Sequence, residues 1–583
     1  MLRKQNTIIA VIFSVFIAAI LLFPVDENEK EIIVFSKPSG FYNFEFDLTI
    51  SVPDGWVVYY TLDGSDPNEN SEKYEESIHI YDASDNPNQY SLIDDVSLGY
   101  RPEEVAEIIG EIPNTEWYKI PTYNIDKCTV IRAIAKRKGQ YSEIATNVYY
   151  VGFNNKKGYS GINILSIVSD PSNLFDSEKG IYVLGNTWKN YKESGLINSS
   201  NWGWWSGNFS QRHMKSEREA VIHYFDNSHN LIFTQDIGIR IQGNSSRSLM
   251  PKSINMYTRK KYGGVSFPDI FKNGYRAKAI TLFGGSQDYG SKIRDSLIND
   301  LVSNRDISTR NYIPCAMFLD GEYWGLYFLT EKFDEEWVSY RYSVDSENVV
   351  IFKNDVLEAG IAEDAADYKA TMLFLQTADM RCPEKYEEAC QRVDMQSLID
   401  YYAVMLYIAR YNDWPKGNVE LWRTRTKNVG YSDGKWRWMI FDLNSGSSDI
   451  RYLNEDSIAR VKEEDLIFNN LCNNIDFQQQ FAESMIDIMN TSFAEDQINE
   501  RISYYERILS EPMLAHNNRF FGVDDYLVDS VYSYPEDGFT YHEKLDSIRV
   551  FLSDRRITMC SLLEKHFNIT PLILEDGTIV PQM

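Results

Sequence analysis

Three oxygen-bearing side chains in the second half of the chain have a spacing that suits metal-assisted chemistry on a hydroxyl group. Asp413 lies in an irregular Pro/Gly turn, and Asn418 follows it by five positions. The residues after Asn418 alternate as a strand does, Asp433-Gly434 marks a turn, and the returning strand ends at Asp442. One carboxylate can then face an attacking hydroxyl, while an amide oxygen and a second carboxylate share a hard cation such as Mg²⁺.

This order of residues has two interpretations. An Asp, an Asn five positions on and a second Asp after a hairpin is the order of the protein-kinase catalytic loop and its later metal-binding Asp. Asp and Asn in Pro/Gly turns are, however, ordinarily turn formers and caps. The features that favour the first interpretation lie upstream.

A glycine and serine turn upstream offers a place for phosphate groups. A predicted strand over 235–242 runs into a turn with Gly243, Ser245 and Ser246, and Lys252 begins the returning strand. Because Gly243 has no Cβ, backbone amides can approach phosphate oxygens there. A strand, such a turn and a Lys on the next strand is how a kinase amino lobe holds a triphosphate. An ordinary hairpin loop with a solvated Lys has the same residues.

The segment after this turn predicts a helix and two strands in the order of a kinase amino lobe. The helix is predicted over 286–306, and Asp295 on it is the candidate acidic partner of Lys252. Two strands joined by Asp320-Gly321 follow and end at Glu331. In kinase order they lead to the adenine site, so we expect Glu331 to contact the nucleotide or its lysine. An ordinary surface salt bridge is the alternative.

Composition narrows the classes of partner. The chain has 583 residues and a net charge of −27, from 85 acidic and 58 basic residues. Nucleic acids and anionic lipid surfaces attract proteins with excess positive charge, so neither is expected as a partner. Basic segments, cations and neutral polymers fit better. Six cysteines in a chain of this length do not indicate a disulfide scaffold, and their spacing does not indicate zinc.

The amino terminus predicts a membrane segment. Residues 8–25 carry no charge, basic residues precede them and acidic residues follow. Such a segment is just long enough to span a bilayer, with the amino terminus in the cytoplasm and the rest of the chain outside. We therefore expect an N-terminal transmembrane helix within residues 1–30. A cleaved signal peptide, which would make the protein secreted, is the alternative.

Residues 31–152 are predicted to form a β-sandwich, because alternating Tyr, Val and Ile stretches are separated by turn residues. The stretches YYTLDGSDP at 59–67 and VIRAIAKRKGQYSEIATNVYYV at 130–151 resemble the chitobiase and fibronectin-III-associated modules of bacterial surface proteins. Such modules usually position or tether a partner domain. Trp56 is expected in the core, with a sugar platform as the alternative.

Four motifs identify the main domain. IRIQGNSSRSLMPKS, DGEYWGLYFLTEKFD, NDWPKGN and FDLN occur in this order, and the chain from 162 to 569 resembles the CotH family of spore-coat and surface kinases. The resemblance implies an α+β fold in which an atypical protein-kinase-like domain at 153–570 follows the β-sandwich and the transmembrane helix, and a tail at 571–583 ends the chain. It also implies transfer of phosphate from ATP to Ser or Thr with Mg²⁺ or Mn²⁺.

The resemblance assigns a role to each matched residue. Asp413 is implied as the base or hydroxyl-orienting group, and Asn418 and Asp442 as metal ligands. The residues implied to bind the nucleotide are Gly243, Ser245, Ser246, Lys252 and Glu331.

The chain departs from the family pattern in two places. It has one Lys at 252 where two adjacent ones are common, and Asn444 stands where the family usually has a carboxylate-rich ending. The second departure weakens a second metal site.

The expected acceptor is a basic, Ser/Thr-rich secreted or surface protein, because the chain is acidic and the anchor places it outside the cytoplasm. The alternative function is an inactive surface adhesin or glycan-binding protein built on a kinase-like domain. The retention of Asp413, Asn418, Asp442 and Lys252 in order speaks against it. A glycoside hydrolase with paired carboxylates has no motif to support it.

Overall fold

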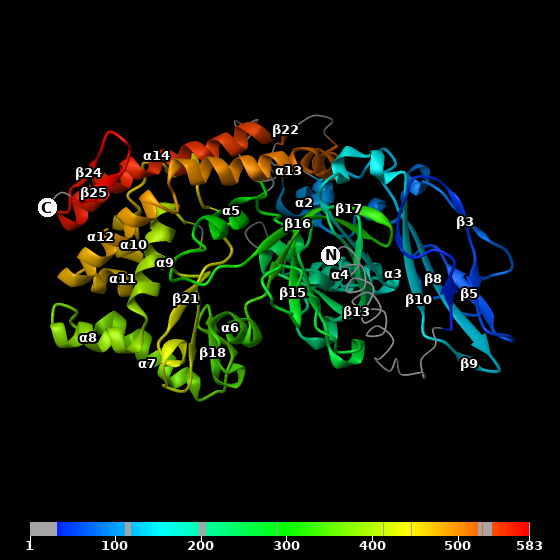
Figure 1. Ribbon diagram of the computed structural model, residues 1–583, viewed down its shortest axis with the longest axis horizontal. Coiled ribbons are helices and arrows are strands. Elements are labelled where there is room, and N and C mark those ends of the chain that lie inside the picture. The colour runs from blue at the N-terminus through cyan, green and yellow to red at the C-terminus, as the bar shows by residue number, and fades with distance from the viewer. Residues whose placement is uncertain are drawn as a thin grey trace, which may run out of the picture.

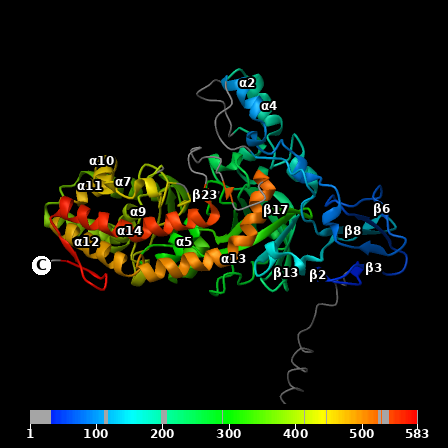
Figure 2. The same ribbon diagram turned by 90° about the horizontal axis from the view of Figure 1, so that it is seen from above.

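The computed structural model describes residues 32–581 except for 111–117, 197–205, 289, 412, 445, 523–526 and 529–538. Three parts follow one another along the longest axis of the molecule: a small β-domain, a β-barrel and a helix-rich part (Figure 1). Two long helices, α13 (Glu495–Phe521) and α14 (Tyr541–Phe567), run side by side along one edge (Figure 2).

The N-terminal β-domain is built on one sheet with the strand order β2-β10-β8-β5-β6, and β9 pairs with β8. The small sheets β1-β4 and β3-β7 share an apolar core with it, which includes Leu48, Ile80, Ile131 and Tyr149. The strands are β1 (Val34–Phe35), β2 (Gly40–Tyr42), β3 (Phe46–Leu48), β4 (Ile50–Ser51), β5 (Val57–Thr61), β6 (Glu72–Lys73), β7 (Ile78–Ile80), β8 (Thr129–Arg137), β9 (Gln140–Tyr141) and β10 (Ala145–Val151).

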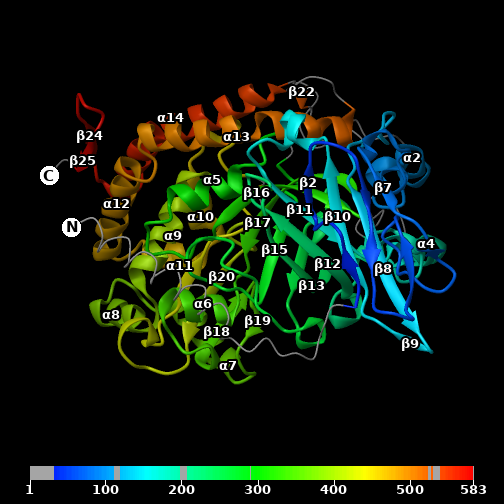
Figure 3. The same cartoon turned by 45° about the vertical axis from the view of Figure 1, so that its right-hand side comes forward.

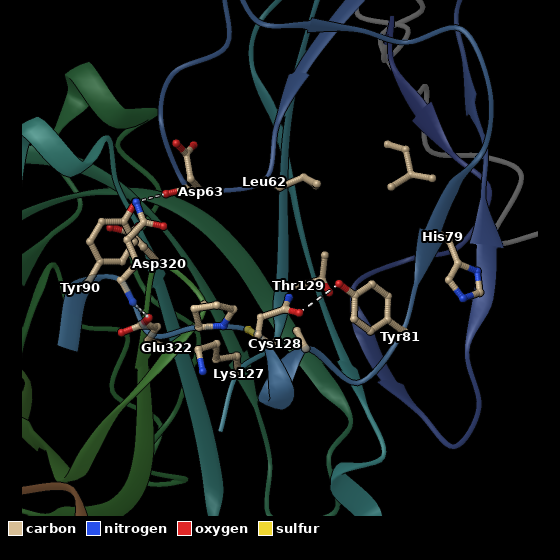
Figure 4. A pocket seen from close by; sticks show the side chains of 16 residues that line it. Leu62, Asp63, His79, Tyr81, Tyr90, Lys127, Cys128, Thr129, Asp320 and Glu322 are labelled. Atoms are coloured by element: carbon tan, nitrogen blue, oxygen red, sulfur yellow. Dashed lines mark hydrogen bonds between the residues drawn. The ribbon is translucent and has the colours of Figure 1, made fainter. Parts of the chain in front are cut away.

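A polar seam joins this β-domain to the barrel. The backbone amide of Cys128 donates to the carbonyl of Gly321 at 2.9 Å, in the turn between β16 and β17 of the barrel. Glu322 accepts the backbone amides of Gln89 and Ser91 at 2.5 and 2.7 Å. A cavity of about 170 Å³ lies at this seam, with residues of both parts in its wall (Figure 4). The two parts are therefore joined by backbone hydrogen bonds.

The barrel closes in the order β11-β12-β13-β14-β15-β17-β16, because β11 pairs with both β12 and β16. Successive residues of β17 point into two different hydrophobic cores. Tyr327 and Leu329 belong to one core, and Leu326 and Phe328 belong to the other, which also contains residues of α5. The strands are β11 (Asn163–Val168), β12 (Arg218–Phe225), β13 (Leu231–Ile241), β14 (Ile254–Tyr257), β15 (Ala279–Phe283), β16 (Tyr312–Leu319) and β17 (Glu322–Glu331).

Short helices accompany the barrel. Helix α2 lies beside α4 (Figure 2), and the Trp188 indole on α4 donates to Glu104 on α2 at 2.9 Å. Helix α5, between β15 and β16, carries Asp295 toward the helix-rich part. The helices are α2 (Pro102–Ile109), α3 (Pro171–Phe175), α4 (Gly185–Glu193) and α5 (Arg294–Leu301).

The predicted fold class needs correction in two respects. The class is α+β, but the β-rich half of the main domain closes into a seven-stranded barrel, which the kinase-like prediction did not include. The predicted N-terminal transmembrane helix is not supported, since the described part of the chain contains no helix with the length and apolar character that a membrane crossing needs. Residues 8–25, to which that helix was assigned, lie outside the described residues.

The helix-rich part surrounds a four-stranded sheet with the order β19-β18-β20-β21 (Figure 3). The strands of this sheet are β18 (Val349–Lys353), β19 (Val356–Ala359), β20 (Glu420–Thr424) and β21 (Arg437–Met439). Two small two-stranded sheets lie near the end of the chain: β22 (Leu527–Val528) pairs with β23 (Phe539–Thr540), and β24 (Pro571–Ile573) pairs with β25 (Ile579–Pro581). The helices are α6 (Glu335–Tyr342), α7 (Asp364–Thr377), α8 (Pro383–Arg392), α9 (Met395–Tyr407), α10 (Ser457–Glu464), α11 (Leu466–Leu471) and α12 (Ile475–Asn490), with α13 and α14 as given above.

One buried arginine ties α14 to the end of α9. The Arg555 side chain is fully buried, and burial lowers its pKa to about 10. Its guanidinium donates to a set of main-chain and hydroxyl oxygens: those of Leu406, Tyr407, Tyr452, Leu453, Glu455 and the Ser457 hydroxyl. Since α9 leads directly into the loop with Asp413, Arg555 fixes the base of that loop.

We expect Arg555→Met to lower the free energy of unfolding by at least about 3 kcal/mol, because several buried carbonyl oxygens lose their donors at once. Chemical denaturation followed by circular dichroism measures this. Arg507→Met on the exposed side of α13 is the control and should change the stability by less than about 0.5 kcal/mol. Equal effects of the two substitutions would contradict this role of Arg555.

Candidate active site

The loop between α9 and β20 holds two of the predicted site residues in an unusual backbone conformation. Asp413 has φ 61° and Asn418 has φ 56°, values that non-glycine residues seldom adopt. The loop is held in place by Trp414, whose buried indole donates to the Tyr401 hydroxyl at 2.9 Å. Gly417 closes the turn by donating its amide to the Asp413 carbonyl at 2.6 Å. The described residues of the loop are thus held by a contact with α9 and by a hydrogen bond within the turn.

The hairpin of β20 and β21 brings Asn418 and Asp442 into contact. In the antiparallel register Glu420 lies opposite Met439, so the residue before β20 meets the segment after β21. The Asn418 amide donates to Asp442 Oδ2 at 2.6 Å. About a third of the Asp442 side chain is exposed, and its φ of 59° is again positive. This pair is the first element of the site.

Arg410 joins the pair to Asp413. Its guanidinium is fully buried and lies 3.9 Å from Asp442 Oδ2. Burial lowers the pKa of Arg410, while the carboxylates of Asp442, Asp295 and Asp413 oppose that shift. The side chain of Asp413 is exposed. The sequence order gave no signal for Arg410, because its importance comes from burial.

Asp295 lies beside Asp442, away from its predicted partner Lys252. The Asp295 carboxylate accepts the Leu443 amide at 3.0 Å and the Tyr312 hydroxyl at 3.4 Å. Burial is the main cause that raises the pKa of Asp295, and the nearby Asp442 charge adds to it. Together they bring this pKa to about 6. Helix α5 therefore contributes a carboxyl group to the site itself.

Lys252 lies beneath its own turn. Its ammonium donates to the Arg247 carbonyl and sits 3.9 Å from the centre of the Phe209 ring. Complete burial, together with the Arg247 charge, holds the pKa of Lys252 well below its usual range. Its described contacts do not include Asp413, Asn418 or Asp442, so the structure does not bring this residue together with the others.

The other predicted nucleotide residues form local contacts. Gly243 has φ 113°, and the chain after it curls into a 3-10 turn at Ser245–Ser248. The Arg247 side chain folds back to donate to the Gly243 carbonyl at 2.7 Å, so this turn is closed from within.

Glu331 is buried between two asparagines. The Asn273 side chain donates to one carboxylate oxygen at 2.7 Å, and the Asn311 backbone and side chain donate to the other at 3.0 and 3.1 Å. Its described hydrogen bonds are therefore with amides, where the sequence predicted a nucleotide, a lysine or a surface salt bridge.

A row of polar side chains crosses the barrel wall toward the site. Cross-strand neighbours share one face of a sheet, and the register pairs each member of the row with the next. The row runs through Arg240, Asn255, Thr281, Thr330 and Tyr312. The Thr281 hydroxyl donates to Asn255 at 2.7 Å, and the Tyr312 hydroxyl reaches Asp295 at the far end. Sequence patterns missed this row because it depends on the register of four strand pairs.

The side-chain oxygens at the site are suitable ligands for a hard divalent cation. Asp442 and Asn418 offer carboxylate and amide oxygens, and the Asn444 side-chain oxygen nearby in sequence is buried without a hydrogen-bond partner among the described residues. Oxygen ligands are those that Mg²⁺ takes. The described residues contain no group of three or more His, Cys, Asp and Glu side chains suited to a metal. A cation here would therefore need further oxygen ligands from outside these side chains.

Two family models match the chain. The model described as CotH kinase protein matches residues 239–559, which contain Asp413, Asn418, Asp442 and α5. The model described as Fn3 associated matches residues 47–149, within the N-terminal β-domain. A comparison with curated proteins found no match. The two matches confirm the resemblance that the sequence motifs indicated.

The buried Asp295 carboxyl makes stability depend on pH. Its pKa rises from 3.8 to about 6 on folding, so the native state holds a proton that the unfolded chain has lost between these values. Stability therefore falls as pH rises from about 4 to about 6, by about 3 kcal/mol in total. We expect Asp295→Asn to remove this loss and to stabilise the protein at pH 7, as denaturation at pH 4.5 and 7 would show.

The control for this measurement is Asp554→Asn on the exposed face of α14, which should leave the pH dependence unchanged. A variant Asp295→Asn that keeps the full wild-type loss of stability between pH 4.5 and 7 would contradict the burial of a titrating carboxyl at this position.

Proposed function

Because the chain belongs to the CotH kinase protein family, we propose that it is a protein kinase that transfers the γ-phosphate of ATP to Ser or Thr hydroxyls of a protein. The observation that carries the proposal is the contact of Asn418 with Asp442 at 2.6 Å, next to the loop of Asp413 and around the buried Arg410. Such an arrangement of side chains suits a site that positions a phosphoryl group and neutralises its charge.

Each residue of the site has a task in this reaction. Asp413 is exposed and accepts the proton of the attacking hydroxyl as the new O–P bond forms and the bond to the ADP leaving group breaks. Asp442 and Asn418 would hold a divalent cation through their oxygens. Mg²⁺ or Mn²⁺ bound there supplies the positive charge that phosphate oxygens need. The loop keeps Asp413 at the open side through Trp414 and Gly417.

Two further cations lie beside the strand that leads to Asp442. The Lys353 ammonium sits 3.7 Å from the centre of the Phe441 ring and 3.2 Å from Glu420. The Arg310 guanidinium stacks on Phe333 at 3.9 Å and lies 3.6 Å from Glu420. We propose that Lys353 and Arg310 offset the negative charge of the nucleotide. Lys252, in contrast, supports the turn of Gly243, Ser245 and Ser246 from below.

The acceptor that fits best is a basic protein, since the chain carries a net charge of −27. A secreted or surface protein rich in Ser and Thr meets this requirement, and the proposal places the reaction outside the cytoplasm. The support for this part is the charge of the chain together with the Fn3-associated domain at 47–149.

The test is phosphate transfer by the full-length protein. With γ-labelled ATP and Mg²⁺ or Mn²⁺, we expect label on the protein itself or on a basic, Ser/Thr-rich acceptor. Asp413→Asn and Asp442→Ala should each lower the rate by about 100-fold or more, because they remove the proton acceptor and a metal ligand. The measurement is the initial rate of label incorporation.

Asp496→Asn, an exposed carboxylate in the first turn of α13, is the matched control and should keep the wild-type rate. Label transfer that persists unchanged in Asp442→Ala would refute the assigned site. Wild-type protein that neither binds ATP nor transfers phosphate would favour a binding protein on a kinase-like domain.

A further inference from the structure

Arg410 is anchored by its backbone, while its side chain is left without hydrogen bonds. The Arg410 amide donates to the Met405 carbonyl at 3.0 Å, and its own carbonyl accepts from Arg460 at 2.8 Å. The side-chain atoms Nε, Nη1 and Nη2 are all buried, and none has a hydrogen-bond partner among the described residues. Burying a guanidinium without hydrogen-bond partners costs free energy, so the Arg410 side chain does not stabilise the fold through hydrogen bonds.

Arg555 shows what a structural arginine looks like in the same protein. Both side chains are fully buried, and both lie near the carboxyl-terminal end of α9. Arg555 donates to several backbone carbonyls, whereas Arg410 faces carboxylates at longer range. The two residues therefore differ in function although they match in burial.

The surroundings of Arg410 are acidic. Asp442 Oδ2 lies 3.9 Å from the guanidinium, and the charges of Asp295 and Asp413 also act on it. Tyr401 is a further titratable neighbour. Without Arg410, the site would carry one more net negative charge in a poorly solvated place. Free divalent cations would then be attracted more strongly, and an anionic nucleotide would be repelled more strongly.

We propose that Arg410 is a positioning residue that sets the charge of the Asp295, Asp413 and Asp442 cluster, so that the site favours a metal-bound nucleotide over the free metal ion. Arg410 acts through these carboxylates, because its buried nitrogens are not open to a ligand. The inference rests on the proposed nucleotide-dependent function.

Opposite changes in two affinities distinguish this role from a structural one. Arg410→Met removes the charge and keeps an apolar side chain of similar length. We expect Arg410→Met to bind free Mn²⁺ about tenfold more tightly and the Mn²⁺ complex of an ATP analogue about tenfold more weakly than the wild type. A loss of structure would weaken both.

The full-length protein is used for three measurements: Mn²⁺ binding by electron paramagnetic resonance, binding of a fluorescent ATP analogue with Mn²⁺, and the melting temperature. Arg410→Lys keeps the charge and should lie close to the wild type in both affinities. The melting temperature of Arg410→Met should fall, because the substitution leaves the carboxylates of Asp295 and Asp442 without their counter-charge, and the opposite changes of the two affinities distinguish this loss from general unfolding. Arg555→Met is the matched control, with a lower melting temperature and a wild-type ratio of the two affinities.

Four results would overturn the inference: both affinities of Arg410→Met falling together, both staying unchanged, Arg410→Lys behaving like Arg410→Met, or a wild type that binds no Mn²⁺. The Mn²⁺ and melting arms do not depend on catalysis. A wild type that binds Mn²⁺ but no nucleotide would refute the proposed function, while tighter Mn²⁺ binding by Arg410→Met would still support the role of Arg410 as counter-charge.

Discussion

The register of the β20-β21 hairpin is the constraint on which the site depends. Glu420 lies opposite Met439, and this pairing places Asn418 beside the segment after β21, where its side chain lies 2.6 Å from that of Asp442. A shift of the register by one residue would turn the side chains of one strand to the other face of the sheet. Helix α9 stabilises this register, because it packs against β21 and the Trp438 amide donates to the Ser397 hydroxyl on α9 at 3.0 Å.

The barrel reaches the same place from the other side. Helix α5 presents Asp295 to the Leu443 amide, so the segment after the hairpin is held by both halves of the domain. The strand before α5, β15, contains Thr281 and no lysine. The positive charges nearest to Asp442 and Phe441 come instead from Arg410, Lys353 and Arg310.

The sequence predicted what local pairing determines and missed what long-range packing determines. The hairpin that ends at Asp442 follows from alternation and an Asp-Gly turn, so the proximity of Asn418 and Asp442 could be inferred. The closure of the barrel depends on the pairing of β11 with β16, about 150 residues later in the chain, and no local pattern encodes it. The position of Lys252 depends on its contact with Phe209, about 40 residues earlier in the chain, and the burial of Arg410 has no sequence signature.

Stability and function are divided between different parts of the domain. Asp413, Asn418 and Asp442 all have positive φ, and the buried side chain of Arg410 beside them has no hydrogen-bond partner among the described residues, so the site stores unfavourable free energy. Such an arrangement persists only when the surroundings determine it. Helices α9 and α14 hold the surroundings in place, because Arg555 on α14 donates to the carbonyls at the end of α9 just before the loop begins. The rigid scaffold thus ends where the reactive loop starts.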